Sequence, residues 1–164
     1  MKILLLFIIL NVSPLIAQEV EECVFDQTTQ TDEFIKKKGE FKDYEWNDET
    51  KTATVKLESG NILRVFRGGC VHFGMSGELE ILDNIVDLSE TKYWLEKALW
   101  VSDKVFDDSD NQFLKNQLTL ENYTLESDSN SIYIFIPHEY YDEFSIAVRK
   151  ENGKIFLYVG YYFS

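Results

Sequence analysis

The sequence predicts an α+β domain in which one long central helix packs on a face of an antiparallel β-sheet built from hairpins, with one or two short helices added. Apolar residues alternate at a period of two before residue 82 and again after residue 131, as in half-buried strands. Between residues 88 and 106 the apolar spacing changes to that of a helix. Strands, one helix and strands again are typical of a sheet with its helix on one side.

The first half contains a predicted hairpin. Apolar and polar side chains alternate over residues 53–57, Ser59-Gly60-Asn61 forms a turn, and residues 62–66 form the returning arm. Two more strands are expected at residues 70–73 and 79–82. We read the intervening Gly74-Met75-Ser76-Gly77 as a turn, because glycine and serine cluster in loops.

The central helix is expected from about residue 88, where Asp87 or Ser89 can cap it, to residue 106. One apolar stripe should pack on the sheet, and it contains Leu88, Trp94, Leu95, Ala98, Leu99, Val101, Val105 and Phe106. The acidic run 107–111 is expected to be a solvated linker that caps a following helix through Asp110. Residues 113–118 fit a second short helix, although residues 118–123 fit a strand equally well. Residues 28–39 fit a short helix.

The second half is again rich in strands. Residues 131–137 are apolar on both faces, which predicts a central strand. The chain then forms a hairpin whose arms are residues 144–148 and 155–159, joined by a type I′ turn at Glu151-Asn152-Gly153-Lys154. The two halves hint at a duplicated unit, although their residues do not match well enough to define a repeat.

Residues 1–17 have the pattern of a cleaved secretory signal peptide. Lys2 precedes an apolar run, and the segment ends on Ala17, a small residue before Gln18. Asn11 and Ser13 interrupt the run before the length of a membrane span. We therefore expect one α+β domain over residues 18–164, secreted or periplasmic and without a membrane anchor.

The charge of the chain restricts its partners. Its formal net charge is −13, and removal of residues 1–17, whose only charged residue is Lys2, makes it −14. Nucleic acids and anionic lipid surfaces carry the same sign and are disfavoured, whereas a basic extracytoplasmic protein would be attracted. Solubility alone is the other interpretation of the charge.

The two cysteines predict one disulfide. Cys23 and Cys70 are the only cysteines, and exported proteins meet an oxidising compartment. A Cys23–Cys70 bond would join the mature N-terminal segment to the middle of the chain.

No catalytic, metal or cofactor motif is found in the sequence. Ser76 lacks the second glycine of a nucleophile elbow, since Glu78 occupies that position. The run 107–111 lacks the glycine and glutamate of an EF-hand loop. An irregular, weaker cation site in this run remains an alternative. His72 and His138 are the only histidines, and neither belongs to a ligand cluster.

The residues that favour a binding role are aromatic. Tyr93 and Trp100 lie seven residues apart on the polar side of the helix, where another part of the chain covers them or a partner contacts them. The loop with His138, Tyr140 and Tyr141 could extend such a surface.

We expect an acidic binding protein, such as an inhibitor or immunity-type partner of a basic extracytoplasmic enzyme. The alternatives are a small secreted hydrolase, with His138, Glu139 and Asp142 as candidate residues, and a structural or adhesive module of the cell envelope. The oligomeric state is left open.

Overall fold

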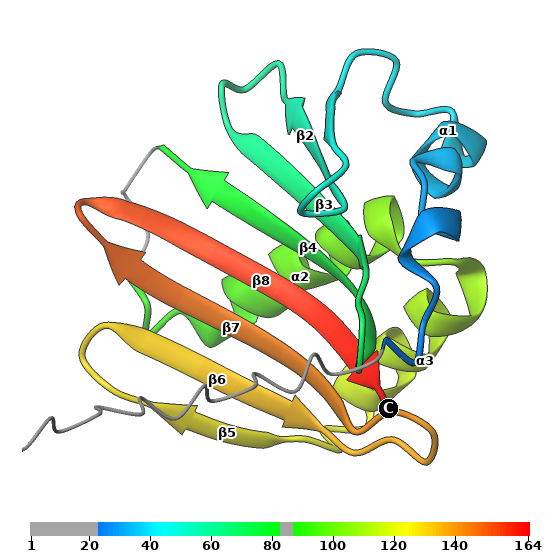
Figure 1. Cartoon of the computed structure of the whole chain (residues 1–164). Helices are drawn as coiled ribbons and strands as arrows, with labels where there is room; N and C mark the ends of the chain where they lie inside the picture. Colours follow the sequence, from blue (N-terminus) through cyan, green and yellow to red (C-terminus); the bar gives the residue numbers. More distant parts are fainter. Residues whose placement is uncertain (1–22, 83–86) are drawn as a thin grey trace, which may run out of the picture.

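A computed structural model describes residues 23–82 and 87–164, so the predicted signal peptide lies outside the described residues. Eight strands form one antiparallel sheet in the order β1-β2-β3-β4-β8-β7-β6-β5 (Figure 1). The strands are β1 (Glu45–Asn47), β2 (Thr52–Lys56), β3 (Ile62–Gly68), β4 (Phe73–Ile81), β5 (Thr124–Ser127), β6 (Ser131–Ile136), β7 (Glu143–Glu151) and β8 (Lys154–Phe163).

The sheet consists of two four-stranded meanders that meet at its centre. Strands β1 to β4 form one and β5 to β8 the other, and β4 pairs with β8 from Phe73↔Phe163 to Ile81↔Ile155. The two halves therefore share one strand layout, although their sequences do not define a repeat.

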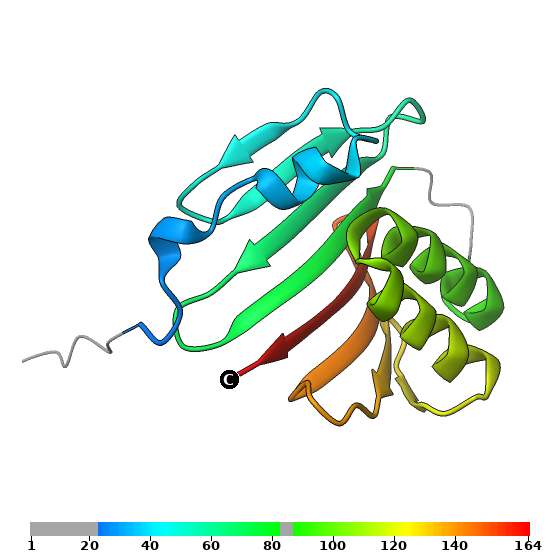
Figure 2. The same cartoon turned by 90° about the vertical axis from the view of Figure 1, so that its right-hand side faces the viewer.

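The helices cover one face of the sheet and leave the other face open (Figures 1 and 2). They are η1 (Gln27–Thr29), α1 (Glu33–Lys38), α2 (Thr91–Val105) and α3 (Asp108–Thr119). α2 and α3 follow each other between the two meanders, and α1 contributes Ile35 to the core. We call the face opposite these helices the open face.

The expected single long central helix is not confirmed, because two helices of similar length share the sheet. α2 has 15 residues and α3 has 12. They are separated by Phe106, whose backbone is extended, and by Asp107, whose side chain accepts hydrogen bonds from the backbone of Ser109 and Asp110. Asp107 thus caps α3, the role expected of Asp110, and residues 108–111 are helical instead of a linker.

The apolar stripe of α2 packs on the sheet as predicted. Trp94, Ala98, Val101 and Val105 are buried, while Leu95 is only partly buried. The exposed Lys92 and Glu96 lie on the other side of the helix.

Ser76 does not lie in a turn, contrary to the sequence expectation. β4 runs through it without a break and pairs Ser76 with Phe66 on one side and Gly160 on the other. The nearby glycine serves the approach of α2, since a Cβ at Gly77 would lie 2.6 Å from Val101 Cγ1. Sequence alone could not separate a glycine needed for close packing from one needed for a turn.

β6 is not central, because β5 alone lies beyond it and forms the sheet edge. Its two apolar rows differ in environment. Ile132, Ile134 and Ile136 are buried beneath the helices, whereas Tyr133 is 37% exposed and Phe135 39% exposed on the open face. The apolar residues on the second face of β6 are therefore exposed aromatic side chains and not core residues.

The two predicted hairpins and the disulfide are confirmed. β2 pairs with β3, and β7 pairs with β8 around Asn152 and Gly153, which both have positive φ as a type I′ turn requires. Cys23 and Cys70 are bonded, with their Cα atoms 4.6 Å apart. The N-terminal segment is therefore held at the turn between β3 and β4.

Candidate binding groove

A groove of about 470 Å³ lies between α3 and the loop that joins β6 to β7. It is lined by Phe113, Gln117, Asn122, Pro137, His138, Glu139 and Tyr140. Three of the residues that the sequence singled out, His138, Glu139 and Tyr140, therefore line one cavity. We call it the α3 groove.

His138 fixes the conformation of the loop. Its Nδ1 accepts hydrogen bonds from the backbone N–H groups of Tyr140 at 3.0 Å and Tyr141 at 3.1 Å. The imidazole ring also contacts Phe113 edge-on, with ring centroids 4.4 Å apart. One side chain thus ties the loop to α3 and organises its own turn.

A stack of rings joins the groove to the core. His138 stacks on Tyr141 at 4.0 Å, and Tyr141 stacks on Tyr161 of β8 at 4.1 Å. The Tyr141 hydroxyl donates a hydrogen bond to Asp110 Oδ1 at 2.7 Å, and Asp110 is itself buried. Burial, with the Asp110 carboxylate as a second cause, raises the pKa of Tyr141 above its ordinary value, so the phenol stays neutral. Tyr141 is therefore a half-buried structural support of the loop.

Tyr140 has the opposite environment. Its side chain is 79% exposed, the largest value among the large exposed hydrophobic side chains of the described residues. Its backbone N–H is nevertheless held by His138. An exposed ring thus projects from a loop whose base is fixed.

The groove is neutral to acidic. Glu139 is its one formally charged lining residue, and no lysine or arginine is among the lining residues. Asp142 and Glu143 follow in the same part of the chain. The local charge therefore has the same sign as the net charge of the protein.

His138 is poorly placed to act as a base. Its Nδ1 lone pair already accepts two backbone N–H groups, so a proton could be taken there only by breaking the turn. Asp142, a candidate in the hydrolase hypothesis, accepts a hydrogen bond from Ser164 Oγ at 2.8 Å. Over residues 23–82 and 87–164, no group of three or more His, Cys, Asp or Glu residues could hold a metal ion.

Tyr93 and Trp100 lie on another part of the surface. Trp100 is 37% exposed, whereas Tyr93 is half-buried, contacts Trp94 at 4.9 Å and has Lys97 Nζ 5.5 Å from its ring centroid. Lys104, one helical turn beyond Trp100, forms an ion pair with Glu40 just after α1.

The two predicted aromatic groups lie on different elements. Trp100 lies on α2, one turn before Lys104, whose ion-pair partner Glu40 follows α1, while His138 packs on Phe113 of α3. A continuous surface over both groups stays a prediction.

Comparisons with family models, curated proteins and solved structures found no match. Among the described residues, no helix is long and apolar enough to cross a bilayer.

Sequence reasoning missed the α3 side of the groove. Phe113, Gln117 and Asn122 come from a segment whose pattern fitted a helix or a strand, and their proximity to the loop at 137–140 is a tertiary feature. Helical spacing from the Asp107 cap would have placed Phe113 and Gln117 on one side of α3, four residues apart.

Proposed function

We propose that this chain is an extracytoplasmic binding protein that holds a basic protein segment in the α3 groove, with Tyr140 as the main anchor. An inhibitor or an immunity-type partner of a basic enzyme is the form of this function that we favour. The observation that carries the proposal is the 79% exposed Tyr140 ring on a loop whose base is fixed by His138.

The rigidity of the loop favours binding. Tyrosine is enriched among the residues that dominate interface energies, because its ring buries a large area and its hydroxyl can bond. A loop that must first become ordered loses part of that energy. Here the hydrogen bonds of His138 and its stacking on Tyr141 have already fixed the loop.

Charge supports a basic partner. The chain carries a formal net charge of −13, and the groove adds Glu139 without an opposing cation in its lining. Such a field raises the association rate of a cationic protein more than it slows dissociation.

Export is part of the proposal. The pattern of residues 1–17 supports a signal peptide, and the bond between Cys23 and Cys70 fits a compartment that oxidises thiols. Secreted and periplasmic locations both fit these features.

The alternatives receive less support from the geometry. A hydrolase using His138 as a base conflicts with the two backbone donors on Nδ1. A structural module would pair a strand of its partner with an edge strand of this sheet, which is β1 or β5. These strands have only three and four residues, so they offer few backbone groups for pairing.

The test is affinity capture from the native extracytoplasmic fraction with the wild-type protein and with Tyr140→Ala. Tyr133→Ala is the matched control, because Tyr133 is also exposed but lies on the open face. We expect Tyr140→Ala to weaken binding of the captured basic protein by more than about 1 kcal/mol, or about fivefold, and the control to leave it unchanged. Equal binding by all three proteins would refute the proposed site.

Trp100→Ala tests the second predicted area in the same assay. If Trp100 contacts the partner, its truncation weakens capture while the melting temperature stays the same. A loss of stability without a loss of capture assigns Trp100 to packing of α2 and leaves the α3 groove as the interface.

A further inference from the structure

A second cavity, of about 410 Å³, lies on the helix-covered side of the sheet, next to the N-terminal segment. We call it the Arg67 pocket. It is lined by Thr29, Thr31, Glu33, Phe34, Lys37, Lys38, Arg67, Met75, Val105, Asp107 and Tyr161.

The wall of this pocket is firmly attached to the sheet. Gln30 is buried, and its side chain exchanges two hydrogen bonds with the backbone of Gly69, one from Nε2 at 2.8 Å and one to Oε1 at 2.9 Å. The Cys23–Cys70 bond holds the same segment to the same turn. The pocket is therefore formed before any ligand binds.

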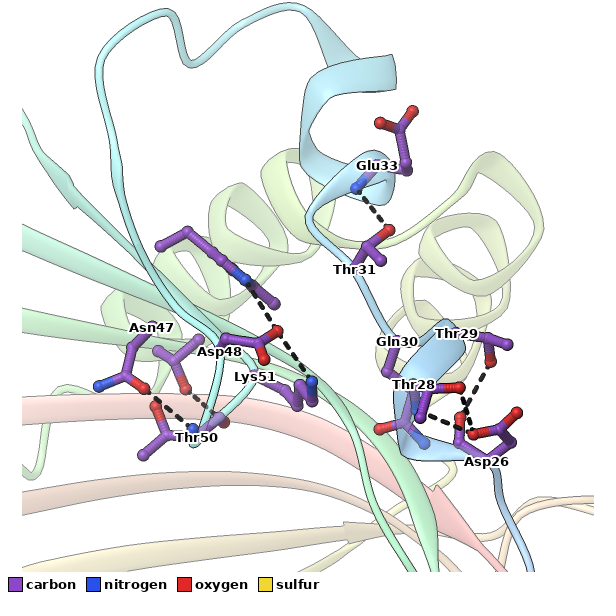
Figure 3. Close-up of polar contacts among 12 residues, drawn as sticks. Asp26, Thr28, Thr29, Gln30, Thr31, Glu33, Asn47, Asp48, Thr50 and Lys51 are labelled. Carbon is purple, nitrogen blue, oxygen red and sulfur yellow. Dashed lines mark hydrogen bonds and ion pairs between the residues drawn. The ribbon is translucent and has the colours of Figure 1, made fainter.

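The segment is also ordered internally. Asp26 accepts hydrogen bonds from the backbone and hydroxyl of Thr28, and its carbonyl accepts one from the Thr29 hydroxyl (Figure 3). The N–H of Glu33 points at the hydroxyl of Thr31 (Figure 3). These short-range bonds fix the backbone that carries two hydroxyl groups to the pocket.

Arg67 is unusual in a chain with 29 acidic residues. The other arginines, Arg64 and Arg149, form ion pairs with carboxylates, whereas Arg67 has no such partner among the described residues. Its guanidinium lies instead 5.7 Å from the ring centroid of Phe34 and 5.2 Å from that of Phe73. Two rings orient the group while its donors remain available to a ligand.

The acids in the lining already have partners. Glu33 lies 3.6 Å from Lys36, and Asp107 accepts the N–H groups that begin α3, which lowers the pKa of Asp107. Lys38 is used structurally, since it donates to the carbonyls of Asp103 and Phe106 at the end of α2. The lining formally carries three cations and two carboxylates, and Arg67 and Lys37 are the two cations without a hydrogen-bond or ion-pair partner among the described residues.

The other lining groups are apolar. Phe34, Met75, Val105 and Tyr161 are carbon-rich, and Met75 and Val105 belong to the buried core. A ligand that suits this pocket has an anionic group for Arg67 and a compact apolar body for the remaining wall.

We propose that the Arg67 pocket binds a small organic carboxylate, with the carboxylate held by Arg67 and Lys37 and the apolar body lying against the carbon-rich wall. The site is independent of the α3 groove, because no residue lines both cavities. A free inorganic anion would use the same cations but would leave the apolar wall without a contact.

Titration calorimetry with benzoate tests the proposal on the full mature chain. Benzyl alcohol supplies the ring without the charge, and inorganic phosphate supplies the charge without the ring. We expect saturable one-site binding of benzoate that is tighter than that of either comparison compound. Equal binding of phosphate, equal binding of benzyl alcohol, or no binding of benzoate would each overturn the proposal.

Variants localise the benzoate. Arg67→Gln is expected to weaken binding by about fivefold or more, because hydrogen bonds to charged groups are stronger than neutral ones. Lys37→Gln, on the exposed side of α1, is a second variant that does not depend on the packing around Arg67. Lys115→Gln on α3 is the control and should bind benzoate as the wild type does. Unchanged binding in both pocket variants would contradict the assignment, whatever their melting temperatures.

Discussion

The α3 groove and the Arg67 pocket lie at opposite ends of one aromatic stack, and they differ in the sign of their charge. His138 lines the groove, Tyr161 lines the pocket, and Tyr141 lies between these two rings. Around the groove the charge is acidic through Glu139, whereas the pocket presents Arg67 and Lys37. We thus propose ligands of opposite charge for two cavities of one protein, whose formal net charge is −13.

The two cavities also differ in how they are built. The groove depends on a local turn, in which His138 binds the backbone two and three residues later. The pocket depends on contacts that are distant in sequence, since Gln30 and Gly69 are 39 residues apart and the disulfide spans 47. Net charge therefore predicts the sign of long-range attraction, but the local fold determines which ligand each cavity can hold.

Removal of the disulfide should have the largest effect and should separate the two cavities. Replacing both Cys23 and Cys70 by serine is expected to lower the free energy of unfolding by about 4 kcal/mol, on the chain-entropy estimate for a loop of this length. The pocket wall loses its covalent attachment, so benzoate binding should weaken, while capture of the basic protein through the groove should persist. Urea unfolding and both binding assays measure these effects. If the double serine variant bound benzoate as tightly as the wild type does, the pocket would not need the disulfide.

Glu80→Gln should destabilise the protein without affecting either cavity. Glu80 points to the open face of the sheet, where its side chain is covered by its neighbours and buried. Its carboxylate accepts hydrogen bonds from Arg64 Nη2 at 2.7 Å and from Lys154 Nζ at 2.5 Å. Loss of its charge should cost about 1 to 3 kcal/mol, because Lys154 loses its carboxylate partner and Arg64 keeps only its ion pair with Glu78. Changed binding in this variant would mean that the binding assays report stability.

The contribution of Glu80 should also depend on pH. Lys154 and then Arg64 lower the pKa of Glu80 in the folded protein. The stabilisation is present above the unfolded pKa, about 4.3, and is lost as the pH falls through the lower folded pKa. The difference in unfolding free energy between wild type and Glu80→Gln should therefore be full at pH 7 and shrink below about pH 4. A constant difference over that range would contradict the ion-pair account.

Tyr141→Phe should have a smaller effect and tests what the stack contributes. The ring is retained, but Asp110, which is buried, loses the hydroxyl that bonds to it at 2.7 Å. We expect a loss of about 1 to 2 kcal/mol in unfolding free energy and little change in binding at either cavity. If binding fell at both ends, the hydrogen bond rather than the stacking would be what positions them.

The sequence predicted the features that depend on neighbouring residues. Asn152-Gly153 identified the turn of the last hairpin because both residues adopt positive φ. Helical periodicity found the buried stripe of α2, and the disulfide followed from there being only two cysteines.

For features that depend on tertiary contacts, the sequence-based predictions were either missing or wrong. Ser76 lies in a strand that pairs on both sides, and the neighbouring Gly77 makes room for α2, which no local pattern reveals. Tyr133 and Phe135 are exposed because their side of β6 belongs to the open face, next to the edge strand. Arg67 was not singled out, because its lack of a carboxylate partner is visible only once the ion pairs are known.

A hydrogen-exchange footprint of the complex with the captured basic protein distinguishes binding in the α3 groove from binding elsewhere on the surface. Binding in the α3 groove should slow exchange in α3 and the following turn, over residues 112–122, and in the loop at residues 137–141. Exchange at residues 29–38 beside the Arg67 pocket should stay unchanged. Protection confined to α2 around Trp100, or to the open face around Tyr133, with none at residues 137–141, would contradict binding in the α3 groove.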